Sequence, residues 1–149
     1  MTDNFCYLLR VRYAECDAQK VVFNGKYVEY IDIAVSEYMR ACMGNYNDVL
    51  SRGIDWQVVS VTVNWKAPAH FDDVIAMTVA TKRIGTSSFT FEINFYNYET
   101  SMPIASSEIV YVTVSADEHQ KMAIPNDMRK TLEDGAPNTT IDHAGVKNT

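Results

Sequence analysis

The amino-acid sequence predicts an α+β domain in which one long helix is wrapped by a five-stranded antiparallel sheet. Only one long segment repeats its apolar residues at spacings of three and four, which is typical of an amphipathic helix. Five segments instead alternate apolar and polar residues, which is typical of strands with one buried face. Tight turns join the last four of these segments, so we expect them to form an antiparallel meander.

The first expected strand covers residues 5–13. Phe5, Tyr7 and Leu9 share one face of it, whereas Arg10 and Arg12 point to the other. Residues 15–25 break the alternation, and we therefore expect a loop between this strand and the helix.

The helix is expected over residues 27–42, with a length of about 24 Å. Its apolar residues lie three or four apart, and polar residues occupy the opposite face. The apolar stripe consists of Tyr27, Tyr30, Ile31, Ala34, Val35, Tyr38, Met39 and Cys42. Gly44 is a stop signal for this helix, and residues 45–53 are expected to hold a short helical turn.

The four remaining strands are expected at residues 57–66, 72–83, 88–98 and 105–116. Pro68 ends the first of them, because proline cannot donate to a strand ladder. A short helix is expected at residues 125–132. We therefore expect one domain over residues 1–133, followed by a flexible C-terminal tail over residues 134–149, whose composition is rich in Gly, Pro, Asn and Thr.

Composition and charge exclude several classes of protein. Hydrophobic residues make up 47% of the 149 and charged residues 21%, which argues against disorder. The net charge of −6 disfavours a nucleic-acid partner. No apolar run reaches the length of a membrane span, and the start of the chain lacks the pattern of a secretory signal. Three cysteines without a CxxC pair fit a reducing compartment, so we expect a cytoplasmic protein with no membrane partner.

Two motifs resemble those of hotdog thioesterases of the 4-hydroxybenzoyl-CoA thioesterase and YbgC-like kind. The first covers residues 11–33, and its matching positions are Arg12, Tyr13, Glu15, Asp17, Val21, Val22, Phe23, Asn24 and Tyr27. The second covers residues 65–73, from Trp65 through Pro68 to Asp73. The resemblance spans roughly residues 5–116, in the right order of elements. It implies a hotdog fold, in which a long central helix is wrapped by the sheet.

The resemblance also implies hydrolysis of an acyl-CoA thioester, with Asp17 as the catalytic carboxylate. Such a carboxylate acts on water as a general base or attacks the carbonyl itself, and the sequence does not separate these routes. The backbone amides near Phe23, Asn24 and Gly25, at the start of the helix, are the expected oxyanion donors. Asn24 is equally well explained as a helix N-cap.

Two residues depart from the family pattern. Lys20 stands where the family usually has Gly, a residue that often meets a need for a permissive backbone. Asn24 stands where many members have His or Tyr. A paired-carboxylate mechanism with Glu15 is an alternative, but we expect Glu15 to have a structural role.

Binding of the substrate is expected to involve residues from several elements. The CoA phosphates need donors, and the turn between two strands offers Lys82, Arg83, Ser87 and Ser88. Tyr27 and Trp56 are candidates for the acyl pocket. The three histidines have no metal-ligand spacing, so no metal is expected. We expect no cofactor.

Family members pair two sheets edge to edge as dimers, often as tetramers, with active sites at the subunit interface. A homodimer, or a homotetramer, is therefore expected here. Two rival functions stay open: a hotdog hydratase or dehydratase acting on acyl thioesters, and a non-catalytic acyl-CoA-binding protein. The sequence does not distinguish aromatic, short-chain and long-chain acyl groups, or CoA from an acyl-carrier-protein thioester.

Overall fold

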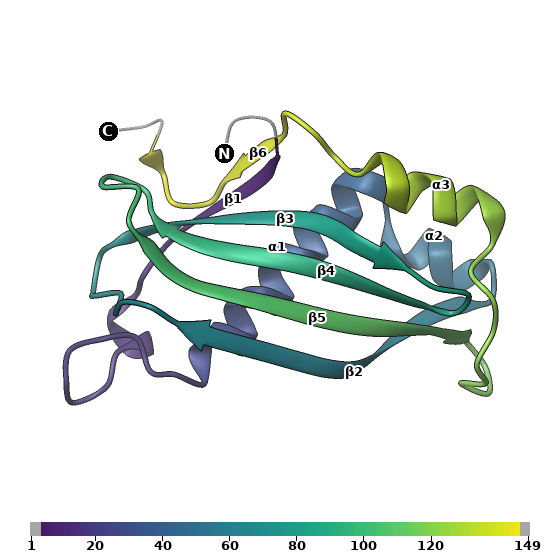
Figure 1. Cartoon of the computed structure of the whole chain (residues 1–149), viewed down its shortest axis with the longest axis horizontal. Coiled ribbons are helices and arrows are strands. Elements are labelled where there is room, and N and C mark those ends of the chain that lie inside the picture. Colours follow the sequence, from purple (N-terminus) through teal and green to yellow (C-terminus); the bar gives the residue numbers. More distant parts are fainter. Residues whose placement is uncertain (1–3, 147–149) are drawn as a thin grey trace.

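The computed structural model describes residues 4–146, which form one sheet, one long helix and three short helical segments (Figure 1). The helical segments are η1 (Tyr13–Glu15), α1 (Lys26–Met43), α2 (Tyr46–Ser51) and α3 (Asn126–Asp134). The strands are β1 (Phe5–Arg10), β2 (Ile54–Trp65), β3 (Val74–Ile84), β4 (Ser88–Asn97), β5 (Pro103–Ser115) and β6 (Thr140–Asp142). No helix of this part of the chain is both long and apolar enough to cross a membrane.

The sheet runs in the order β2-β5-β4-β3-β1-β6, and its first five strands pair antiparallel. The expected five-stranded antiparallel sheet is corrected in one respect, because β6 pairs parallel with β1 as a sixth strand. Thr140–Asp142 lie in the segment that we expected to be a flexible tail, and they belong to the sheet. The domain limit at residue 133 and the mobility of the tail stay predictions, and residues 147–149 lie outside the described residues.

Helix α1 packs its apolar stripe against the inner face of the sheet, as its 3.6-residue period predicts (Figure 1). Tyr27 contacts Phe95 near one end of the helix, with ring centroids 5.4 Å apart. Tyr38 contacts Phe91 near the other end, at 5.1 Å. Burying each such side chain contributes about 1.5–3 kcal/mol, so this contact orients the helix along the sheet. Gly44 ends the helix with a φ of 81°.

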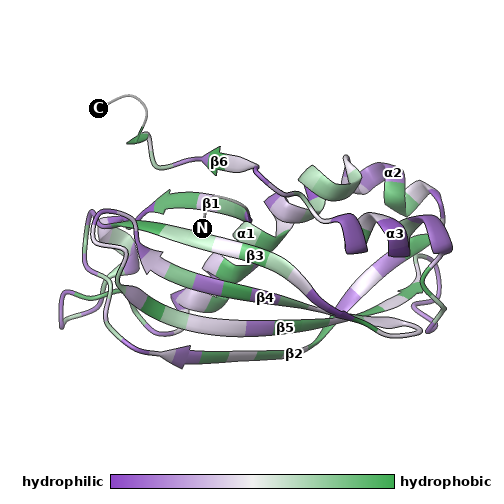
Figure 2. Ribbon diagram, turned by 45° about the horizontal axis from the view of Figure 1, so that its top comes forward, coloured by the Kyte–Doolittle hydropathy of each residue, from purple (hydrophilic) through white to green (hydrophobic). Residues whose placement is uncertain are grey.

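Alternation along the strands separates a buried face from a polar one. Figure 2 shows apolar and polar bands alternating along β4 and β5. The inward side chains of β4 are fully buried, namely Phe89, Phe91, Ile93 and Phe95. The opposite face carries Glu92 and Asn94. One face is thus free for the helix and the core, as the period-2 pattern predicts.

The two edges of the sheet differ. At the β1 edge, His143 donates its backbone N–H to the Leu8 carbonyl, and its ring lies 3.0 Å from the Tyr7 hydroxyl. Ala144 joins a small apolar cluster with Cys6 and Leu8 on the outer face. The C-terminal segment therefore covers the β1 edge, whereas no strand within residues 4–146 pairs with the outer edge of β2.

Candidate active site

Residues 16–22 form a small hairpin that presents Asp17 between β1 and α1. Asp17 donates its N–H to the Val21 carbonyl at 2.9 Å, and Lys20 returns an N–H to the Asp17 carbonyl at 2.9 Å. Val22 donates to the Ala69 carbonyl, and Val21 bridges to His70. Backbone pairing with residues 69–70, which precede β3, therefore holds the hairpin in place.

The Asp17 carboxylate is half-buried, and Oδ1 accepts the Gln19 N–H at 2.8 Å. This local bond is the Asx turn that aspartate favours in a tight turn. No cation pairs with Asp17 among the described residues. One oxygen is therefore used by the turn, and the carboxylate keeps capacity to accept further hydrogen bonds.

Lys20 closes the hairpin with a φ of 66°, in the left-handed region. This conformation explains why a glycine suits this position, since a side chain here brings Cβ close to the following carbonyl. The departure from the family pattern therefore preserves the turn at the cost of local strain.

Replacing Lys20 with Gly is expected to raise the free energy of unfolding by about 1 kcal/mol, because the strain is released. For a chain of this size, the melting temperature should rise by about 2–4 °C, as measured by circular dichroism. The control is Lys20→Ala, which removes the charge but keeps Cβ and should leave the melting temperature unchanged. An equal rise in both variants would attribute the gain to the lost charge.

The expected oxyanion donors Phe23, Asn24 and Gly25 lie in the turn that precedes α1, and the amide of one of them is not free. Phe23 donates its N–H to the Glu15 carbonyl at 2.9 Å, so this amide is occupied. Within residues 4–146, the amides of Asn24 and Gly25 have no hydrogen-bond partner. Gly25 is the N-cap residue, and no side chain caps the helix, so the interpretation of Asn24 as an N-cap is wrong. These two free donors lie at the positive end of the helix dipole, which favours negative charge on a bound group.

An apolar groove of about 430 Å³ opens beside these donors. It is lined by Val21, Val22, Asn24, Tyr27, Trp65, Lys66, Ala67 and Pro68. Tyr27 is buried and packs edge-on against Trp65, with centroids 5.7 Å apart. Burial raises the pKa of the Tyr27 hydroxyl, so this group stays protonated. Asp17 does not line the groove itself but pairs with Val21 at its rim.

The expected CoA-binding residues flank the β3–β4 turn, which lies at the far end of the sheet from the hairpin (Figure 1). Val74, at one end of β3, adjoins the chain that holds the hairpin, whereas Ile84 is ten residues away, or about 33 Å. Lys82 pairs with Glu92 and Glu108 across the outer face of the sheet. Arg83 is exposed, Ser87 is buried, and Ser88 is half-buried. Within a single chain, Lys82, Arg83, Ser87 and Ser88 therefore lie far from Asp17.

Trp56 lies at that far end too, beside a larger cavity of about 650 Å³. The cavity is lined by α1 from Asp32 onward, the start of α2, the start of β2 and Tyr111 on β5. Its aromatic wall includes Tyr46, whose ring centroid is 6.0 Å from that of Trp56. A cavity is thus present at both ends of β2, but only the groove at the Trp65 end is mostly apolar and adjoins the Asp17 hairpin.

Sequence reasoning missed two neighbours of the hairpin. Trp65 lines the groove, and the second motif could have indicated it, because it places Trp65 before Pro68. His70 pairs with Val21 through the backbone, although 53 positions separate it from Asp17. Its exposed ring lies 3.6 Å from the Asp73 carboxylate. No local pattern could have predicted this proximity.

Comparisons with known proteins point in one direction. A family model described as the thioesterase superfamily matches residues 19–104, which is more than half of the chain. The acyl-CoA thioester hydrolase YbgC of Escherichia coli O157:H7 is 25% identical over 124 residues, covering 83% of this chain and 92% of that protein.

Solved structures share the fold. The 1,4-dihydroxy-2-naphthoyl-CoA thioesterase from Synechocystis superposes with a TM-score of 0.79 at 18% identity, covering 88% of this chain and 96% of that one. The DHNA-CoA thioesterase from Staphylococcus aureus gives a TM-score of 0.77 at 16% identity, covering 87% and 90%. At these identities the likeness establishes the hotdog arrangement of helix and sheet.

Proposed function

The chain belongs to the thioesterase superfamily and is a thioester hydrolase, and from this premise we propose that it hydrolyses an acyl-CoA to the free acid and CoA. The observation that carries the proposal is the pair of unpartnered amides of Asn24 and Gly25 at the start of α1. Asn24 lines an apolar groove beside the Asp17 hairpin, and Gly25 follows it directly in the chain. Hydrolysis of an acyl thioester needs a carboxylate, fixed donors for an oxyanion, and apolar space for the acyl group.

In this proposal the thioester carbonyl oxygen accepts hydrogen bonds from the Asn24 and Gly25 amides. Negative charge develops on that oxygen during attack, and preorganised donors at the positive end of a helix stabilise it. Asp17 either removes a proton from the attacking water or attacks the carbonyl to form an anhydride that water then hydrolyses. In both routes the C–S bond breaks and CoA leaves as the thiol.

The Asn24 side chain lines the groove and has no hydrogen-bond partner among the described residues. It replaces the His or Tyr of many family members and offers an amide N–H donor without acid–base capacity. Proton transfer therefore falls to Asp17. Lys66, which also lines the groove and has no ion pair within residues 4–146, supplies a positive charge for a CoA phosphate.

We also propose that the working enzyme is a homodimer paired through β2, from which a tetramer could be built. No charged residue lies between Trp56 and Trp65, so this open edge lacks the charges that usually prevent pairing. Antiparallel pairing of two β2 strands would bring the Trp56 end of one copy beside the Trp65 end of the other. Trp56, Lys82, Arg83, Ser87 and Ser88 of the partner would then approach the Asp17 groove.

The test is thiol release from a panel of acyl-CoA esters, from aromatic to long-chain, with an acyl-carrier-protein thioester added. Turnover of one class would name the acyl group. Hydration of an enoyl-CoA without thiol release would instead support the hydratase alternative. Binding of acyl-CoA without any turnover would support a non-catalytic binding protein. Fractionation of the source cells tests the expected cytoplasmic location, which stays a prediction.

A further inference from the structure

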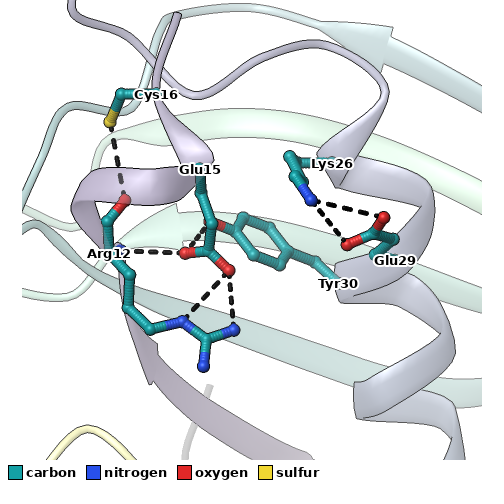
Figure 3. Close-up of polar contacts among 6 residues, drawn as sticks. All are labelled: Arg12, Glu15, Cys16, Lys26, Glu29 and Tyr30. Atoms are coloured by element: carbon teal, nitrogen blue, oxygen red, sulfur yellow. Dashed lines mark hydrogen bonds and ion pairs between the residues drawn. The ribbon is translucent and has the colours of Figure 1, made fainter.

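Glu15 is a buried carboxylate that lies two residues before Asp17 and is 6% exposed. Figure 3 shows its side chain between Arg12, which precedes η1, and Tyr30 on α1. Oε1 accepts the Arg12 backbone N–H at 2.8 Å and the Tyr30 hydroxyl at 2.9 Å. Oε2 accepts Arg12 Nη2 at 2.8 Å and Nε at 3.3 Å. Both oxygens are therefore committed to donors.

The hydrogen-bond partners of Glu15 stabilise its ionised form. Burial raises the pKa of Glu15, but the hydrogen bonds from Arg12 and Tyr30 outweigh burial and leave the pKa below its ordinary value. Glu15 is therefore ionised at neutral pH and can only accept hydrogen bonds. The interaction is lost only in acid, as the pH falls through that lowered pKa. A group so fully occupied has no free oxygen with which to activate water.

The backbone of Glu15 connects the same network to the turn that precedes α1. Its carbonyl accepts the Phe23 N–H at 2.9 Å. The next two residues along the chain, Asn24 and Gly25, carry the unpartnered amides. The Phe23 ring also lies 2.9 Å from where a Cβ on Gly25 would stand, so the turn is closely packed. One residue thus fixes both ends of the loop: Asp17 follows it along the chain, and Phe23 pairs with it.

We infer that Glu15, held by Arg12 and Tyr30, is a positioning residue that sets Asp17 and the Asn24–Gly25 amides relative to each other. This inference rests on the proposed thioesterase function. Hydrogen-bonded networks of this kind hold a reacting geometry, and a displacement of about 1 Å at a site can cost roughly 100-fold in rate. The carboxylate itself touches no substrate, and it acts through the loop that it anchors.

The experiment compares Glu15→Gln and Tyr30→Phe with the parent enzyme on its best thioester. Glu15→Gln places an N–H₂ group against Arg12 donors and should lower kcat about 10- to 100-fold, with KM changed less than about twofold. Tyr30→Phe removes only one hydroxyl and should lower kcat about fivefold. The matched control is Glu29→Gln, the same substitution in an exposed carboxylate that pairs with Lys26 on α1 (Figure 3). It should leave kcat within about twofold.

A second readout does not depend on activity. The Phe23 amide should exchange with solvent at least about tenfold faster in Glu15→Gln and Tyr30→Phe than in the parent, as followed by two-dimensional NMR. Unchanged exchange at Phe23 would overturn the inference, as would a folded Glu15→Gln with the kcat of the parent. Where Glu15→Gln does not fold, Tyr30→Phe decides by the same two measurements. A parent without thiol release would refute the proposed function, and the exchange rates would still test the anchor.

Discussion

Replacing Asp17 with Asn is expected to lower kcat for thioester hydrolysis by about 10²–10⁴-fold, the usual loss when a positioned acid–base group is removed. The substitution keeps the shape of the side chain, and its carbonyl oxygen can still accept the Gln19 N–H that forms the turn. The loop should therefore keep its geometry, so that the loss reports chemistry. Thiol release under saturating substrate measures the effect.

The control for this substitution is Asp48→Asn, which changes an exposed carboxylate in the first turn of α2. It should leave kcat within about twofold of the parent. A kcat for Asp17→Asn within tenfold of the parent, in a folded protein, would remove Asp17 from the mechanism. The Asn24 and Gly25 amides would then have to act with a different base.

A single turnover in ¹⁸O-labelled water detects a nucleophilic Asp17 when water attacks the aspartyl carbon of the anhydride. A general base delivers the water oxygen directly to the product acid, so Asp17 stays unlabelled. A nucleophile forms an anhydride, and attack of water on the aspartyl carbon leaves ¹⁸O in Asp17 and an unlabelled product acid. Mass spectrometry of the peptide that contains Asp17 reads the difference.

Much of the fold could be predicted, because its long elements carry strong periodic patterns. The helix expected at residues 27–42 is observed at Lys26–Met43, since its apolar stripe is uninterrupted. The strand β6 could not be predicted, because three residues are too short for a period. Its parallel pairing with β1 is set by α3 and the chain that follows it, so the position of β6 depends on tertiary structure.

The candidate site was predicted as a motif, but its hydrogen bonds were not. The sequence placed Asp17 and the start of the helix together, and the structure has them in one loop. Sequence alone does not show that the Phe23 amide is taken by the Glu15 carbonyl, because that bond closes across a hairpin. The motif therefore identified the loop, while the free donors follow from its three-dimensional path.

The separation of the binding residues has a simple geometric cause. Trp56 and the β3–β4 turn are joined to the Asp17 end by long strands, and a strand of ten residues carries a side chain about 33 Å away. The sequence pattern gives strand lengths but no partner for the β2 edge. A site that needs residues from both ends of the sheet is therefore complete only if β2 of a second copy pairs antiparallel with β2 of the first.

Replacing Val59 with Lys on the β2 edge is expected to produce a monomer that has lost at least about 100-fold of the parent activity. Val59 is 58% exposed and lies at the bulge between Val58 and Ser60. Two-fold pairing would bring two copies of the introduced charge to the same edge, where charges oppose strand pairing. Light scattering at micromolar concentration measures the mass, and thiol release measures the activity.

The matched control is Met102→Lys, which introduces the same charge at a residue that is also 58% exposed but lies next to β5 in the β4–β5 turn. It should stay dimeric and active. Because Trp56, Lys82 and Arg83 lie at the end of the sheet opposite to Asp17, activity and dimerisation should be lost together in the Val59 variant. A fully active monomer would show that the Asp17 groove of one chain suffices, and Lys66 would then be the first candidate for the CoA phosphates. A variant that remains dimeric would move the interface away from β2.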